Sequence, residues 1–307
     1  MDLKKIRTYS AKSRKHKVAL SALAKAGKKN SRFSDFYDDL PDFLAVKELK
    51  STVTAIVAAH KSGKPVIFGL GAHVIKVGLS PILIDLMKKK VVNCIALNGA
   101  GAIHDFELAT LGHTSEDVGE NLKSGMFGMV RETLTDMNEA IAELKDPSFE
   151  PRGLGALLGK KLLKMKAPHR EKSILYNAYE LDIPVTVHVA IGTDTIHMSP
   201  LLDPRALGEA SYLDFEILCG MICKLQGGVY LNIGSAVILP EVFLKALTVA
   251  RNLGYKVKDF TTVNMDMLQH YRPNQNVLKR PGGKAYSLIG HHEIMVPLLY
   301  QALLEEI

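Results

Sequence analysis

Six short apolar segments, each ending in glycine or polar residues, constrain the fold of this chain more than any other feature. They occupy residues 65–71, 91–99, 185–192, 228–234, 256–264 and 285–290. Between them lie stretches with helical periodicity near residues 74–88, 127–144, 172–182, 207–226, 240–253 and 293–306. Such alternation is typical of βαβ units, and the unbroken apolar runs indicate strands covered on both faces. We therefore expect an α/β domain with a mostly parallel sheet of six or more strands.

The first 60 residues differ from the rest in composition. Residues 1–30 carry ten Lys or Arg and one acidic residue, a local charge of +9, whereas residues 31–307 sum to −2. We expect a basic helical N-terminal extension over residues 1–60, with a break near Leu40 and Pro41, followed by the ligand-binding domain over residues 61–307. A solvated arm is the favoured interpretation of the basic run. Because the rest of the chain has no basic stripe and no Trp, we expect no nucleic-acid partner.

Length and composition set further limits. The chain has 307 residues, of which 47% are apolar and 23% charged, so globular folding is favoured over disorder. No apolar run reaches 18 residues and the N-terminus has no signal-peptide pattern, so we expect no membrane partner. Three cysteines suit a reducing compartment. We expect a cytoplasmic protein.

The carboxyl ends of the six segments concentrate the residues that could do chemistry. Ligands of an open parallel sheet bind beyond these ends, where small residues allow close backbone approach and helix N-termini present free N–H groups to phosphate. The sequence Asn98-Gly99-Ala100-Gly101 is the best phosphate-binding candidate, although the full G-x-G-x-x-G pattern is absent. Tight turns without a ligand are the alternative. The remaining candidates at this edge are Gly71, Ala72, His73, His104, Asp194, His197, Gly234, Ser235, Thr261, Thr262, His291 and His292.

Histidines are unusually frequent near this edge. The six are His73, His104, His197, His270, His291 and His292. A zinc site is one interpretation, but the chain has no H-x-x-x-H pattern on a helix, so we predict no metal. General acid–base catalysis, or binding of an anionic substrate group, is favoured. Cys219 and Cys223 lie four residues apart on an apolar helix, where thiols usually serve as packing.

Four segments carry a family resemblance. NGAGAIHDFELA, VAIGTDTIHM, LNIGSAVILPEVF and GHHEIMVPLL resemble deoxyhypusine synthase, and more closely its bacterial deoxyhypusine synthase-like relatives. The likeness runs from about residue 65 to 305. It implies a Rossmann-like fold, NAD bound at subunit interfaces and a homotetramer built as a dimer of dimers. Authentic members oxidise a polyamine and pass an aminobutyl group through an imine on an active-site lysine.

The resemblance also assigns residues. It implies NAD contacts from Gly71, Ala72, His73, Asn98, Gly99, Ala100, Gly101, Asp194, Gly234, Ser235, Thr261, Thr262 and His291. After a one-residue shift, the imine-forming lysine corresponds to Lys279. The substrate-binding carboxylates of the family correspond here to His104 and His197, its catalytic histidine lies in a motif replaced by Glu241-Val242-Phe243, and its tryptophan is absent.

These departures predict a changed substrate pocket. Paired carboxylates stabilise a buried dication, and imidazoles do not. The first hypothesis is an NAD-dependent transferase or oxidoreductase acting on an amine, with His104, His197 or His292 as acid or base and Lys279 as the imine-forming residue. A non-catalytic NAD-binding regulatory protein is one alternative, and a metal-assisted hydrolase is another.

Overall fold

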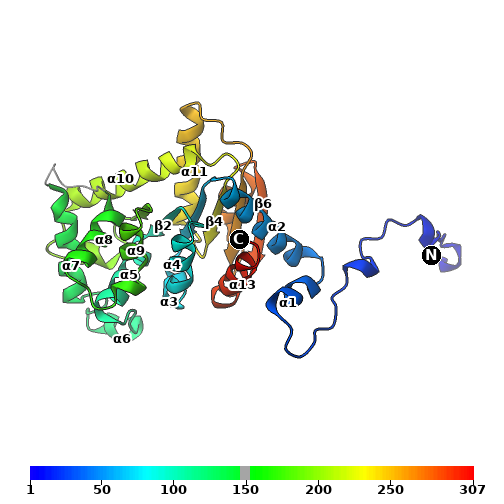
Figure 1. Ribbon diagram of the computed structural model, residues 1–307, viewed down its shortest axis with the longest axis horizontal. Coiled ribbons are helices and arrows are strands. Elements are labelled where there is room, and N and C mark those ends of the chain that lie inside the picture. The colour runs from blue at the N-terminus through cyan, green and yellow to red at the C-terminus, as the bar shows by residue number, and fades with distance from the viewer. Residues whose placement is uncertain (146–152) are drawn as a thin grey trace.

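Six parallel strands form one sheet in the order β3-β2-β1-β4-β5-β6 in the computed structural model, which describes residues 1–145 and 153–307 (Figure 1). The strands are β1 (Val66–Leu70), β2 (Cys94–Asn98), β3 (Val185–His188), β4 (Val229–Ile233), β5 (Thr261–Asp266) and β6 (Lys284–Ile289). All neighbouring pairs are parallel. The chain runs outward from β1 to β3 and then from β4 to β6, so strand order switches between β1 and β4. In open α/β sheets the ligand-binding crevice is expected at this switch, beyond the carboxyl ends of the two strands. The predicted α/β fold is confirmed.

Helices connect and cover the strands. They are α1 (Phe33–Asp39), α2 (Leu44–Lys61), α3 (Ala72–Lys76), α4 (Ser80–Lys88), α5 (Gly99–Leu111), α6 (Val118–Lys123), α7 (Arg131–Ala142), α8 (Leu154–Lys164), α9 (Ile174–Glu180), α10 (Pro204–Cys223), α11 (Ile238–Asn252), α12 (Tyr271–Pro273), α13 (His292–Leu304), the 3-10 helices η4 (Glu143–Lys145), η5 (Arg170–Lys172) and η6 (Thr195–Met198), and the π-helix η7 (Asn274–Lys279). The helix predicted over residues 74–88 is divided into α3 and α4, because Gly78 adopts a φ of 81° that breaks the helix. Within the described residues, none of these helices combines the length and apolar content needed to cross a membrane.

The side chains of the sheet alternate between two hydrophobic cores. On one face, Val66, Phe68 and Leu70 pack with α2, α4, α5 and α13, and on the other, Ile67 and Tyr230 pack with α11 and the second half of α10. Every position of β1, β4 and β5 is buried, as the continuous apolar runs predicted.

The three cysteines are free thiols, and two of them belong to the second core. Burial raises the pKa of Cys94 to about 12 and that of Cys219 to about 11. Both therefore remain protonated at neutral pH and serve as packing.

The fifth strand begins later than predicted. The sequence predicted it over residues 256–264, but β5 spans Thr261–Asp266. The backbone N–H groups of Lys258 and Asp259 donate to Oε1 of Gln226 at 2.8 and 3.1 Å, which holds this segment as a turn beside the start of β4. The shift moves Asp266 to the carboxyl end of the sheet and leaves Thr261 and Thr262 at the amino end.

The N-terminal segment is helical only in its second half. Residues 1–32 contain just three short 3-10 helices, η1 (Leu3–Lys5), η2 (Ala11–Ser13) and η3 (Leu20–Ala22), and none of these buries a residue. The helical extension predicted over residues 1–60 is present as α1 and α2. Before α1, clustered like charges and few apolar residues give an isolated helix nothing to pack on. In Figure 1 this segment extends away from the sheet, whereas α2 packs with the core through Leu49, Val53 and Ile56.

Removing residues 1–30 is expected to shift the Tm of the protein by less than about 2 °C, because exposed segments contribute little to stability. The truncation removes two backbone hydrogen bonds to the helical part, from Asp42 N to Ala22 O at 3.1 Å and from Lys25 N to Asp39 O at 3.0 Å. Thermal melting of the full and truncated chains is the measurement. A much larger loss of stability would mean that the arm packs on the domain in solution.

Candidate functional site

The turns that follow β1 and β4 are in contact at the carboxyl ends of these two neighbouring strands. Gly71 N donates to Ile233 O at 2.8 Å, and a Cβ on Gly71 would overlap the carbonyl oxygen of Gly234. Gly234 adopts a φ of 68°, in the left-handed region that favours glycine. Both glycines are therefore required for the close approach of the two turns, which form the floor of the crevice at the switch in strand order.

His292 is buried at this crevice with unused hydrogen-bonding capacity. It is the first residue of α13, its exposed fraction is 1%, and neither ring nitrogen forms a hydrogen bond of normal geometry among the described residues, although the Met265 backbone also acts on the ring. Its Nε2 lies 3.8 Å from Oδ1 of Asp266, and its ring centroid lies 5.6 Å from that of His73. Burial lowers the pKa of His292, although Asp266 opposes this shift. The ring is therefore neutral at pH 7 and offers one donor and one acceptor.

Two asparagines lie beside the crevice within the sheet. Asn232 on β4 donates to Asn264 Oδ1 on β5 at 2.8 Å and to Ser235 O at 2.9 Å, while its own Oδ1 has no partner among the described residues. The Ser235 hydroxyl accepts from Leu239 N at 3.1 Å and so caps the start of α11. Ser235 thus has a structural role, and Asn232 is an additional candidate ligand-binding residue that the sequence analysis did not select.

The predicted phosphate-binding turn at the start of α5 is filled by the protein itself. Asn98 Oδ1 accepts from Gly101 N at 2.9 Å, and a Cβ on Gly99 would overlap the carboxylate of Asp194. Burial raises the pKa of Asp194, while His197 and backbone N–H groups, including that of Ala100, oppose the shift. Because these side-chain acceptors already cap the helix, the turn is a poor phosphate site.

His197 is fixed as part of the neighbouring turn. Its Nδ1 accepts from the backbone N–H groups of Gly192 and Asp194 at 3.1 and 3.3 Å, so the ring proton is on Nε2. That Nε2 lies 4.0 Å from Asp194 Oδ2, and neither atom has a hydrogen-bond partner among the described residues. Both groups therefore retain capacity to bind a polar ligand.

A cavity of about 350 Å³ adjoins Asp194 and contains His104. The Thr114 hydroxyl donates to Glu107 Oε2 at 2.5 Å and lies 2.6 Å from His104 Nδ1. Since the single hydroxyl proton is engaged with Glu107, His104 Nδ1 must donate to Thr114, which leaves a lone pair on Nε2. Thr133 also donates to Glu107, at 3.0 Å. Burial lowers the pKa of His104, against the effect of Glu107, so the ring is a neutral base at pH 7.

Short helix α3 contacts both His292 and this cavity. Its first turn carries Ala72 and His73, whose ring faces His292, and its last residue, Lys76, lines the cavity with His104. Because His73 and Lys76 are three residues apart, they share one face of α3, and this face borders both His292 and the cavity that contains His104.

Three predicted site residues lie elsewhere. Thr261 and Thr262 begin β5 and pair with Lys284 and Ala285 at the amino end of the sheet, so their prediction at the carboxyl end was wrong. Lys279 is exposed and ends η7, two residues before Pro281, whose carbonyl accepts from Arg251 in the last turn of α11. It is thus near the amino end as well, away from the histidines of the same chain.

His291, the remaining histidine among the predicted site residues, lies at the surface. His291 is exposed as the N-cap of α13, with Nδ1 at 3.8 Å from Glu293 Oε1. Across residues 1–145 and 153–307, no group of three or more His, Cys, Asp or Glu side chains is arranged to hold a metal ion.

Comparisons with known proteins identify the fold. No family model and no curated protein matches this chain. A deoxyhypusine synthase candidate from Entamoeba histolytica aligns with a TM-score of 0.54 and 10% identity, over 90% of this chain and 94% of its own. A LOR/SDH-type protein from Methanococcus maripaludis S2 gives 0.52 and 15%, over 92% and 72%. The structure of AgrE in complex with ornithine and NAD+ gives 0.54 and 14%, over 84% and 33%.

These similarities confirm the resemblance at the level of the fold. The chain shares the deoxyhypusine synthase-like α/β fold with these structures, one of which binds NAD+. It spans about a third of the length of AgrE and of the cyanobacterial arginine dihydrolase ArgZ.

Proposed function

We propose that this protein binds NAD in the crevice between β1 and β4 and uses it to oxidise an amine. The observation that carries the proposal is the buried, unpartnered ring of His292 beside Asp266, at the switch in strand order. A buried polar group without a partner is costly, so the ring is suited to hydrogen bonding with a bound ligand.

Only some of the residues predicted to contact NAD lie where they could bind it. His73 and Gly234 lie against His292, and Gly71 lies against Gly234; together with Ala72 these residues would form the contact surface, with Asn232 Oδ1 as a further acceptor. The amides at the start of α5 are capped by Asn98 and Asp194, and Thr261 and Thr262 are remote. When bound, NAD would accept a hydride from the substrate carbon.

The cavity around His104 would hold the amine. His104 Nε2 would accept a proton from the substrate nitrogen, while Thr114 and Glu107 fix the orientation of the ring. The free Asp194 Oδ2 would bind an ammonium group and Lys76 a carboxylate. Amino acids and other amines carrying an acidic group are therefore the first substrates to test, ahead of polyamines. We also propose that the protein assembles as a homotetramer, as the family that its sequence resembles does.

Titration of the nucleotide-stripped protein with NAD in a calorimeter tests the cofactor site. We expect saturation near one site per chain, with the His292→Asn variant at least about tenfold weaker because a direct hydrogen bond is lost. The variant His60→Asn, in the last turn of α2, is the matched control and is expected to bind as the wild type does.

The outcomes separate the hypotheses. Saturable binding followed by NADH fluorescence on adding an amine supports the enzyme, and binding without NADH formation from any amine supports a non-catalytic NAD-binding protein. Absence of binding contradicts both.

A further inference from the structure

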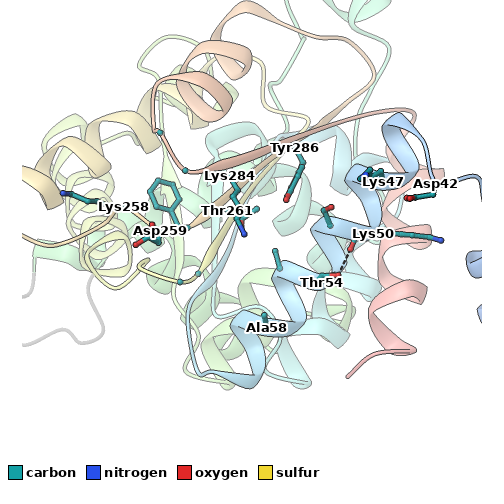
Figure 2. A pocket seen from close by; sticks show the side chains of 17 residues that line it. Asp42, Lys47, Lys50, Thr54, Ala58, Lys258, Asp259, Thr261, Lys284 and Tyr286 are labelled. Atoms are coloured by element: carbon teal, nitrogen blue, oxygen red, sulfur yellow. Dashed lines mark hydrogen bonds between the residues drawn. The ribbon is translucent and has the colours of Figure 1, made fainter. Parts of the chain in front are cut away.

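A groove of about 830 Å³ lies at the amino end of the sheet, between α2 and the first residues of β5 and β6 (Figure 2). It is at the opposite end of the strands from the crevice and shares no lining residue with the His104 cavity. Seven of the seventeen residues that line it are small, which helps to keep it open: Ser51, Ala55, Ala58, Gly227, Gly228, Gly282 and Gly283.

The groove has fixed walls. Glu48 Oε2 accepts from Ser287 N at 2.6 Å, which holds α2 along the exposed edge of β6. On the other side, a Cβ on Gly283 would overlap the carbonyl oxygen of Phe260, so the strand entry requires glycine. The space between α2 and the sheet is therefore maintained by specific contacts of the fold.

The charge around the groove is mainly positive. Lys47, Lys258 and Lys284 line it, and none of them forms an ion pair within residues 1–145 and 153–307. Asp42 also lines it, as does Asp259, whose Oδ2 accepts from Gln226 at 2.9 Å. Lys50 is engaged elsewhere, since its Nζ lies 5.3 Å from the centre of the Tyr37 ring.

One cation and several neutral donors line the same part of the groove. Parallel register places Thr261 directly beside Lys284, and Tyr286 follows two residues later on the same face of β6. Figure 2 shows the Lys284 side chain and the Tyr286 hydroxyl directed into the groove, whereas Lys258 points away. The backbone N–H groups of Gly282 and Gly283 make no hydrogen bond with another described residue.

An ammonium group, hydroxyls and free backbone amides together form the donor set that binds phosphate oxygens. We propose that this groove binds the phosphate group of a small phosphorylated metabolite, with Lys284 as the cation and Thr261 and Tyr286 as hydroxyl donors. The volume falls in the range of small-molecule sites. This site is independent of the proposed NAD crevice.

Calorimetric titration with inorganic pyrophosphate, ribose 5-phosphate and ribose tests the proposal. Both phosphate compounds should bind saturably, with and without NAD present, and ribose should not bind. Lys284→Gln should weaken both by at least about tenfold, as expected for loss of a charge-assisted contact. The matched variant Lys258→Gln should change binding by less than about threefold, because its side chain points away.

Each titration has an outcome that supports the phosphate site and one that contradicts it. Lack of saturation by either phosphate compound, equal binding of ribose, or unchanged affinity in Lys284→Gln would each overturn the proposal. NAD titration of Lys284→Gln should match the wild type, so failure of this site and failure of the NAD crevice are distinguishable.

Discussion

Replacing Asp214 by alanine is expected to lower the free energy of unfolding by about 2–5 kcal/mol, the range for leaving buried donors without an acceptor. Asp214, on α10, has an exposed fraction of 0%, and its Oδ2 accepts from Gly155 N at 2.9 Å and from Val187 N at 2.6 Å. The carboxyl group thus ties the start of α8 to β3. Thermal and denaturant unfolding would measure the loss.

Two variants sharpen this test. Asp117→Ala removes an exposed N-cap of α6 that accepts from Glu120 N at 2.9 Å, and should cost only about 0.5–2 kcal/mol. Asp214→Asn keeps an acceptor oxygen and should retain most of the stability at neutral pH. Equal losses in Asp214→Ala and Asp117→Ala would contradict the role assigned to Asp214.

Asp214 also makes the stability of the protein depend on pH. Burial raises the pKa of Asp214 from 3.8 to about 8, against the effect of the backbone N–H groups. Between these values the folded state holds a proton that the unfolded state releases, so stability is highest at the acidic end and falls as the pH rises toward 8. Asp214→Asn should flatten this slope, and unfolding measured across that pH range is the check.

Replacing Gly71 by alanine is expected to weaken NAD binding by at least about tenfold and to cost about 1–3 kcal/mol of stability through overpacking. The added Cβ would overlap the carbonyl oxygen of Gly234 and force apart the two turns that form the floor of the crevice. Calorimetric NAD titration of a variant shown to be folded by its thermal melt measures the first effect.

Gly208→Ala provides the matched control. Gly208 lies within α10 and a Cβ there meets no atom within 4 Å, so alanine should leave NAD binding unchanged and favour the helix by up to about 1 kcal/mol. If folded Gly71→Ala bound NAD as tightly as the wild type, NAD would not bind at the junction of β1 and β4.

The residue pattern alone predicted the layered α/β fold well, because strand and helix periodicities are local properties of the chain. It also predicted that glycines and histidines gather at one edge of the sheet, and Gly71, His73, Gly234 and His292 do so. It misplaced the start of β5, since the turn at residues 256–260 depends on Gln226, more than thirty residues away in the chain.

What the sequence by itself determined is the set of buried strands, their helical connections and the supply of polar groups after each strand. The tertiary structure alone decided which of these groups meet. It paired His292 with Asp266, oriented His104 through Thr114 and Glu107, capped the turn at Gly99 with Asp194, and separated Lys279, Thr261 and Thr262 from the histidines. These contacts depend on strand register and on segments distant in the sequence, and no local periodicity encodes such distances.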